Sequence, residues 1–207
     1  NWSEEMEKEF GFGWIPDVPD ERDFTYAAPM GLTALPKSVD LRKGFGPVYN
    51  QGQLGSCTAQ AVAGILQFTR GEKGVPAEIP TPSRLFLYYN TRVLEGTVNY
   101  DYGAQIRNSI KSAATYGDCK DTTWPYRITE FRRRPTQAAY SEAAPNKLNG
   151  QQYMRVNQTL NDLKACLAQS NPITFGFAVY SNFMSVAGRT GVCPMPQGSM
   201  TGGHAVV

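Results

Sequence analysis

Asn50-Gln51-Gly52-Gln53-Leu54-Gly55-Ser56-Cys57-Thr58-Ala59 is the stretch that decides how the rest of the chain is interpreted. Its glycines allow the backbone to turn tightly, and a nearly continuous run of apolar residues follows Cys57. This pattern predicts a loop that leads into a buried helix from about Ser56 to Arg70. Cys57 would lie in the first helical turn, where free N–H groups and the helix dipole stabilise a thiolate and lower the pKa of the thiol.

The chain has a single histidine, His204, within Thr201-Gly202-Gly203-His204-Ala205-Val206-Val207. An imidazole beside a thiol takes its proton and then stabilises the thiolate as an imidazolium. We therefore predict that Cys57 and His204 form a reactive pair. The alternative is that both are structural, because cysteine is often a buried inert residue and a lone histidine is usually a packed or surface side chain.

Gln51, Gly52, Gly55, Ser56 and Cys57 together resemble the active-site signature of the papain-like cysteine peptidases. The separation of Cys57 and His204 also falls within the roughly 130–150 residues between nucleophile and histidine in this class. The resemblance runs from about residue 35 to the last residue and is strongest to bacterial and viral members. Its further parts are Gly203-His204-Ala205, similar to the histidine motif of cathepsin B-like members, and Trp124-Pro125-Tyr126, similar to the family's Tyr-Pro-Tyr.

The resemblance implies an α+β, papain-like two-lobe fold, with a helical left lobe, a β-rich right lobe and the active site in the cleft between them. It implies that Cys57 attacks a peptide carbonyl, that His204 forms an ion pair with the thiolate and then protonates the leaving amine, and that Gln51 stabilises the oxyanion. The positions that it implies for substrate binding are Gly55, Gly103, Gly176, Gly203 and Ala205. Small residues at 176 and 205 leave room for a bulky apolar or aromatic substrate side chain.

Three features depart from the family pattern. Leu54 stands where the family usually has a cysteine in a disulfide, and Thr58 stands where an aromatic residue usually follows the nucleophile. The chain ends at Val207, before the place of the family's Asn-Ser-Trp-Gly motif, whose asparagine orients the histidine. We therefore expect the lobe with His204 to be incomplete at its C-terminal end and leave the residue that orients His204 unassigned.

Periodicity divides the chain into a helical part and a β-rich part. We expect lobes over residues 37–150 and 151–207, preceded by a pro-segment-like region over residues 1–36. Residues 127–150 show no clear element. One expected helix covers residues 84–90 and is capped by Thr81 or Ser83, and another covers residues 104–115 and ends at Gly117. A third, short helix begins at Thr159 and ends before Pro172. The expected strands cover residues 153–156 and 173–180, and a further strand contains His204.

The first 35 residues combine eight acidic and two basic side chains with several aromatic ones, whereas the rest of the chain is basic. Exposed tails are usually poor in aromatic residues. We therefore predict that this segment packs on the basic body, with Trp14 or Tyr26 as an anchor. Papain-like enzymes are often made with N-terminal inhibitory segments, which favours a regulatory role in cis.

Composition excludes several other classes of protein. The formal net charge is only +2, which gives no case for nucleic-acid binding, and no apolar run approaches the length of a membrane helix. With Cys57 kept as a thiol, Cys119, Cys166 and Cys193 allow at most one disulfide. The sequence contains no Cys-x-x-Cys pair, so we do not expect a structural zinc site. We expect a monomer without metal or cofactor that acts on peptides or proteins. The family favours a secreted or periplasmic location, and the few cysteines leave a cytoplasmic one open.

Two further functions remain open. The same Cys–His chemistry supports other acyl transfers, such as transglutamination, deamidation or hydrolysis of a non-peptide amide. A third hypothesis is a non-catalytic papain-like binding module whose site is closed by the N-terminal segment. The presence of Gln51, Cys57 and His204 together weighs against that third hypothesis.

Overall fold

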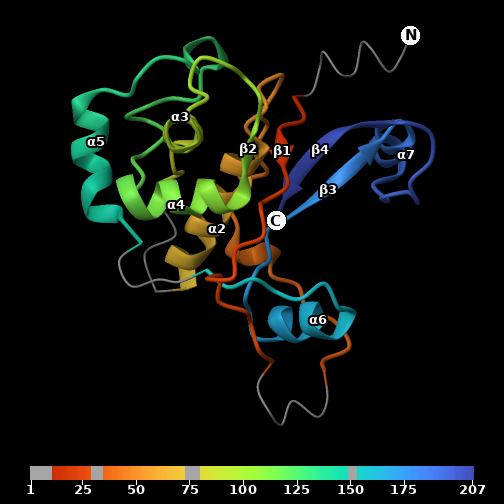
Figure 1. Cartoon of the computed structure of the whole chain (residues 1–207). Coiled ribbons are helices and arrows are strands. Elements are labelled where there is room, and N and C mark those ends of the chain that lie inside the picture. The colour runs from red at the N-terminus through yellow and green to blue at the C-terminus, as the bar shows by residue number, and fades with distance from the viewer. Residues whose placement is uncertain (1–10, 29–34, 73–79, 149–152) are drawn as a thin grey trace.

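The computed structural model of the chain, drawn in Figure 1, describes residues 11–28, 35–72, 80–148 and 153–207. Helices predominate in these ranges, and the strands are short. The helices are α2 (Cys57–Glu72), α3 (Arg84–Glu95), α4 (Ile106–Tyr116), α5 (Gln137–Ala143), α6 (Leu160–Ala168) and α7 (Asn182–Thr190), with 3₁₀ turns at Arg42–Gly44, Ile128–Glu130 and Ala144–Asn146; the strands are β1 (Trp14–Ile15), β2 (Ala104–Gln105), β3 (Phe175–Tyr180) and β4 (Met200–Val206).

The main hydrophobic core forms where α2, α3 and α4 pack together. Four consecutive residues of α3, Leu85–Tyr88, are fully buried, and they meet apolar side chains of α2 such as Val62 and Leu66. Ser83 caps α3 by accepting a hydrogen bond from the Phe86 N–H at 3.1 Å, as expected from the sequence. The predicted helix after the glycine loop is confirmed as α2, which places Cys57 at its first residue.

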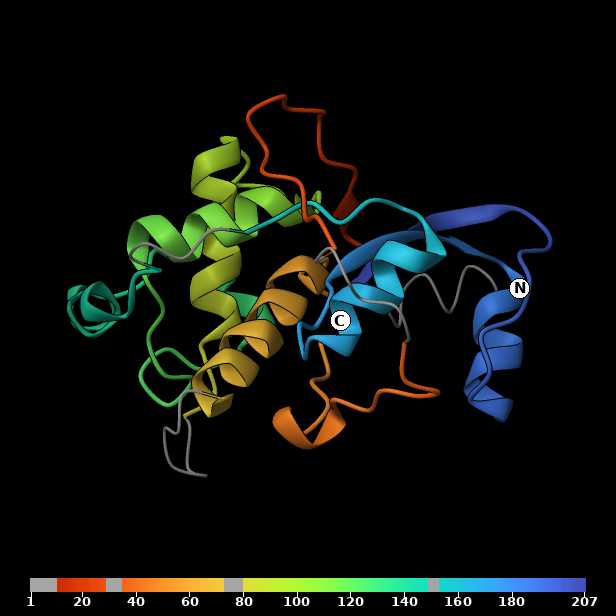
Figure 2. The same cartoon turned by 90° about the horizontal axis from the view of Figure 1, so that it is seen from below.

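Two pairs of strands lie beside this helical core. Strands β3 and β4 form an antiparallel hairpin in which Phe177 stands opposite His204 and Gly176 opposite Ala205. Strand β1 pairs with β2 in parallel and also contacts β3 and β4. In Figure 1, β1 accordingly lies between β2 and β4, and Figure 2 shows helices α3–α5 on one side and the β3–β4 hairpin with α7 on the other.

Several expectations from the sequence need correction. The helix predicted to begin at Ala104 begins at Ile106, because the Ala104 N–H bonds to the Gly13 carbonyl at 2.8 Å and the chain is extended there. The strand predicted at residues 153–156 is only a single bridge between Arg155 and Thr25. Helices α5 and α7 were not predicted. The segment 153–207 therefore contains two helices as well as two strands and is less β-rich than expected.

Some expectations fall on residues that are not described. The acidic residues before Gly11 and the boundary between residues 150 and 151 lie outside the described ranges. Cys57, Cys119, Cys166 and Cys193 are all free thiols. Within the described ranges, no helix is both long and apolar enough to cross a membrane, and no cluster of three or more His, Cys, Asp or Glu side chains is arranged to hold a metal ion.

Candidate active site

Cys57 occupies the first turn of α2 and is fully buried. The turn before it is tight, since the Ser56 N–H bonds to the Leu54 carbonyl at 2.7 Å. The hydroxyl of Ser56 lies 2.6 Å from that of Tyr126, which also donates to the Gln51 carbonyl at 2.9 Å. Tyr126 therefore joins the two ends of the loop that leads to Cys57.

Strand β4, which carries His204, packs against α2, which begins at Cys57. Its neighbour Ala205 shares a buried cluster with Cys57 and Ile106. The imidazole is enclosed by aromatic rings, with the Phe12 and Phe177 centroids at 5.8 and 5.9 Å. Its Nδ1 atom is buried and has no hydrogen-bond partner within the described part of the chain.

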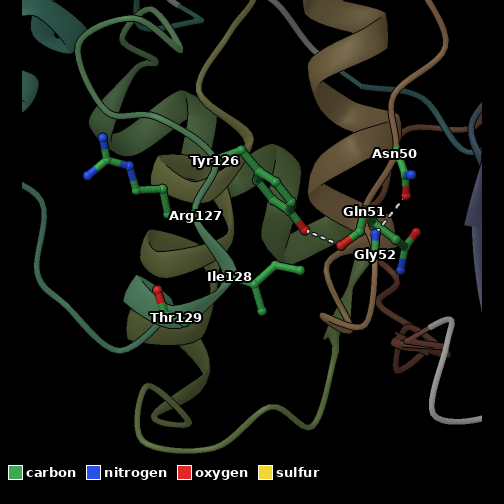
Figure 3. Close-up of a pocket in the computed structure, with 7 residues that line it drawn as sticks. All are labelled: Asn50, Gln51, Gly52, Tyr126, Arg127, Ile128 and Thr129. Carbon is green, nitrogen blue, oxygen red and sulfur yellow. Dashed lines mark hydrogen bonds between the residues drawn. The ribbon is translucent and has the colours of Figure 1, made fainter.

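Gln51 donates from its side-chain amide to two backbone carbonyls, that of Leu54 at 3.0 Å and that of Gly11. The same glutamine borders a pocket of about 490 Å³, shown in Figure 3. This pocket is open and lies beside the loop before Cys57. Its lining consists of Asn50, Gln51, Gly52, Tyr126, Arg127, Ile128 and Thr129.

The N-terminal segment Gly11–Trp14 passes through the middle of this arrangement. Gly13 is wedged between two glycines, since a Cβ on Gly13 would overlap the Gly55 carbonyl and a Cβ on Gly103 would overlap the Gly13 carbonyl. The Trp14 indole covers Gly176, and its backbone approaches Gly203. The residues that the sequence singles out thus lie along four residues of this segment. Gln51 meets Gly11, His204 meets Phe12, and Gly55, Cys57 and Gly103 meet Gly13. Trp14 meets Gly176 and Gly203 and packs against the cluster that contains Ala205.

Burial sets the protonation of the pair in this arrangement. Burial raises the pKa of the Cys57 thiol above its ordinary value, although hydrogen bonds from the backbones of Ala205 and Gly13 oppose the rise. Burial also lowers the pKa of His204. Both shifts favour the neutral thiol and the neutral imidazole. The pKa of the thiol therefore moves in the opposite direction to the one expected from its place at a helix start, because burial outweighs the stabilisation that backbone N–H groups give to the thiolate.

A cluster of charges holds the continuation of the N-terminal segment, up to Asp23, against the body. The buried Asp23 carboxylate pairs with Arg107 of α4 at 2.5 Å, and it also accepts from Arg155 at 2.9 Å and from the Tyr153 hydroxyl at 2.8 Å. Burial opposes its ionisation, but these hydrogen bonds outweigh that and lower the pKa of Asp23 to about 2. Arg107 further donates to the Val18 carbonyl at 2.6 Å. The segment is therefore tied to the body at a second place.

Reasoning from the sequence missed two contributors to the site. Trp14 was expected as an anchor, but nothing in the local pattern indicates that it lies on Gly176. The sequence gives no role to Asp101, yet its carboxylate accepts the Gly55 N–H with both oxygens, at 3.2 and 3.0 Å. Both contacts join positions far apart in the chain, where spacing carries no signal.

Comparisons with known proteins point to one family. The chain is 36% identical over 224 aligned positions to an uncharacterised peptidase C1-like protein of Acanthamoeba polyphaga mimivirus, an alignment that spans 94% of this chain and 71% of that protein. It is 40% identical to the crystal structure of xylellain, a cysteine protease from Xylella fastidiosa, with a TM-score of 0.84 over 96% of this chain and 78% of that one.

More distant similarity supports the same fold. Procathepsin B from Trypanosoma congolense is 18% identical, with a TM-score of 0.69 over 98% of this chain and 71% of that chain. No protein-family model matches the sequence.

Proposed function

The chain belongs to the papain-like C1 family of cysteine peptidases, and we propose that it is a cysteine endopeptidase whose substrate groove is closed by its own N-terminal segment. One observation carries the proposal. A single extended stretch, Gly11–Trp14, lies against every residue to which the sequence assigns a role, and the Gln51 amide holds one of its carbonyl groups. An extended peptide with a carbonyl against an amide donor is the arrangement that a peptide substrate needs.

In the proposed mechanism, His204 accepts the proton of Cys57, and the thiolate sulfur attacks the carbonyl carbon of the substrate. The Gln51 amide and the Cys57 N–H donate to the resulting oxyanion. The imidazolium then gives its proton to the leaving amine as the C–N bond breaks, leaving a thioester. A water molecule that His204 deprotonates attacks the thioester, which releases the acid and restores the thiol.

The closed groove argues for regulation in cis. The segment continues into strand β1, which runs parallel to β2. Just before β1, Gly13 fits between Gly55 and Gly103 with no room for a side chain. A substrate cannot occupy the same space. The Asp23 cluster fastens the segment to Arg107 and Arg155 on separate parts of the body. Activity therefore requires that the segment leave.

The contacts of Trp14 indicate which substrates fit. The indole lies where a side chain on Gly176 would stand, next to Gly203 and against the cluster that contains Ala205. A site that accepts an indole in this way has room for a large aromatic group and little polar recognition. We therefore expect a preference for peptides with a bulky aromatic residue near the scissile bond.

The test uses the full chain with residues 29–34 replaced by the recognition sequence of a site-specific protease, so that the segment is cut after folding and is then separated from the rest of the chain. We expect little hydrolysis of a peptide library before the cut and hydrolysis after it, with labelling of Cys57 by an electrophilic peptide rising in parallel. A Cys57→Ser variant, cut in the same way, is the control.

The products distinguish the competing functions. New peptide termini support the endopeptidase. Ammonia release or crosslinking without new termini would identify another acyl transfer on the same pair. Absence of both hydrolysis and labelling after the cut, in a protein that keeps its melting temperature, would overturn catalysis in favour of a binding module.

A further inference from the structure

The side chain of Asp101 connects two loops that approach the candidate site from different directions. Its carboxylate accepts the backbone N–H of Gly55, at 3.2 Å to one oxygen and 3.0 Å to the other. Gly55 belongs to the loop before Cys57, whereas Asp101 belongs to the loop that ends at Gly103. A backbone N–H that donates to a charged carboxylate makes a stronger hydrogen bond than it makes to a neutral acceptor.

Asp101 is itself held from the helical core. The Tyr88 hydroxyl donates to Asp101 Oδ1, and Tyr88 lies fully buried in α3. Arg92, one helical turn farther along and also fully buried, donates to the carbonyls of Val98 at 2.7 Å and Tyr100 at 3.3 Å. The loop is therefore fixed to α3 at the Asp101 carboxylate and at the two carbonyls just before it, so Asp101 has a position that does not depend on Gly55.

The two glycines that Asp101 ties together enclose the extended peptide in the site. Gly13 lies against Gly55 on one side and Gly103 on the other. Gly55 lies two residues before Cys57, so the Gly55–Asp101 hydrogen bonds join the turn before the nucleophile candidate to the loop that ends at Gly103. All four cysteines are free, so no disulfide links these two loops.

We propose that Asp101 is a positioning residue for the proposed peptidase reaction: through Gly55 it fixes the turn that presents the Cys57 sulfur and backbone N–H to the substrate. The inference rests on the proposed function. Asp101 touches no reacting atom in this role. Its removal loosens the oxyanion site without removing any group that bonds to the substrate.

The test compares Asp101→Ala and Asp101→Asn with the parent in the full chain that carries the cleavable residues 29–34. Asp40→Asn is the matched control, because Asp40 pairs with Arg42 on an exposed loop. After the cut, we expect Asp101→Ala to lower kcat per alkylatable Cys57 roughly 10- to 100-fold, with KM within about two-fold, as the loss of a charge-assisted hydrogen bond predicts. Asp101→Asn keeps an acceptor oxygen and should recover part of the loss, whereas Asp40→Asn should match the parent.

A second measurement makes the inference independent of turnover. Hydrogen exchange of the Gly55 amide is followed in the uncut full chain, where Asp101→Ala should speed exchange at Gly55 about ten-fold or more. An unchanged exchange rate of the Gly55 amide would show that Asp101 does not hold this N–H and would overturn the inference. Faster exchange with unchanged kcat per alkylatable Cys57, whatever the change in melting temperature, would overturn the positioning role. If no form hydrolyses peptides, the proposed function fails, and the rate of Cys57 alkylation replaces kcat: a rate equal to that of the parent overturns positioning, and a slower one supports it.

Discussion

At Gln51, one side-chain amide holds the Leu54 carbonyl of its own loop and the Gly11 carbonyl of the N-terminal segment. If this amide stabilises the oxyanion, Gln51→Ala should lower kcat of the cut protein by about 10²–10³-fold, as loss of one such donor does in other enzymes. The quantity to measure is kcat per alkylatable Cys57. Gln53→Ala is the matched control, because Gln53 is an exposed glutamine of the same loop. Equal losses in the two variants would contradict the role of Gln51.

The Cys57–His204 pair makes a prediction about pH. Burial raises the pKa of Cys57 and lowers that of His204 while the segment is in place. Alkylation of Cys57 in the uncut chain should therefore be slow near pH 7 and should rise only toward strongly alkaline pH. After the cut, hydration returns and the imidazolium stabilises the thiolate, so the same rate profile should shift to lower pH. The exposed thiol of Cys193 is an internal reference, and overlapping profiles before and after the cut would refute the prediction.

Single residues also show which features the sequence could reveal. Gln51, Cys57 and His204 stand out because residue type and spacing carry their signal. The place of Trp14 on Gly176 and the bond of Asp101 to Gly55 carry no such signal. Each depends on how separate elements pack, and a loop aspartate looks the same in a sequence whether or not a backbone N–H faces it.

At the scale of elements, strand β1 has only two residues, and both pair with β2. Gly13, the residue just before β1, tolerates no side chain, because a Cβ there would overlap the Gly55 backbone. Gly13→Ala should therefore weaken the segment in place, by roughly the 1–3 kcal/mol that overpacking costs. Hydrolysis by the uncut chain should rise about 5- to 150-fold. Val18→Ala is the control, because the Val18 side chain is 65% exposed. An equal rise in hydrolysis in both variants would contradict the role of the close fit of Gly13 in closing the site.

Elements with a strong local signal were predicted, and those that depend on partners were not. Helix α6 was found because Thr159 caps it by accepting from the Asp162 N–H. Helix α5 lies in a polar stretch, where its cap at Thr136 and its buried face of Ala139 and Ala143 give a weak pattern. Ala104 was assigned to a helix because its own sequence favours one, yet pairing with the N-terminal segment makes it extended. Tertiary contacts therefore override local preference next to the site.

At the scale of the whole molecule, Asp23 fastens the segment to two parts of the body at once. It pairs with Arg107 in the first turn of α4, directly after β2. It also accepts hydrogen bonds from Arg155 and Tyr153, which come after α5 in the chain. Asp17 adds a weaker link to Arg155 at 3.4 Å and accepts the Arg107 backbone N–H. Opening the segment must break these contacts together, so the cluster resists partial release.

The low pKa of Asp23 fixes how the closed form responds to acid. The pKa in the folded chain is about 2, below the ordinary carboxylate value of roughly 3.9. The contribution of Asp23 to closure is therefore complete above about pH 4 and is lost only as the pH falls toward 2. Labelling of Cys57 in the uncut chain should not increase between pH 7 and pH 5 beyond the change in reagent and thiol chemistry, which a denatured reference measures.

Asp23→Asn should open the segment at neutral pH, because it removes the carboxylate that pairs with the buried Arg107 guanidinium. Removing one partner of a buried pair costs about 3–5 kcal/mol, so Cys57 labelling and peptide hydrolysis by the uncut chain should rise roughly 100-fold or more. Asp20→Asn is the matched control, since Asp20 forms a salt bridge with the exposed Arg22 two residues along the same stretch. If the two variants behave alike with circular dichroism unchanged, Asp23 does not hold the segment; if the parent opens between pH 6 and pH 5, a group with a higher pKa governs release. A rise confined to Asp23→Asn would mean that closure depends on a buried charge pair, which mild acid does not break because the pKa of Asp23 is about 2.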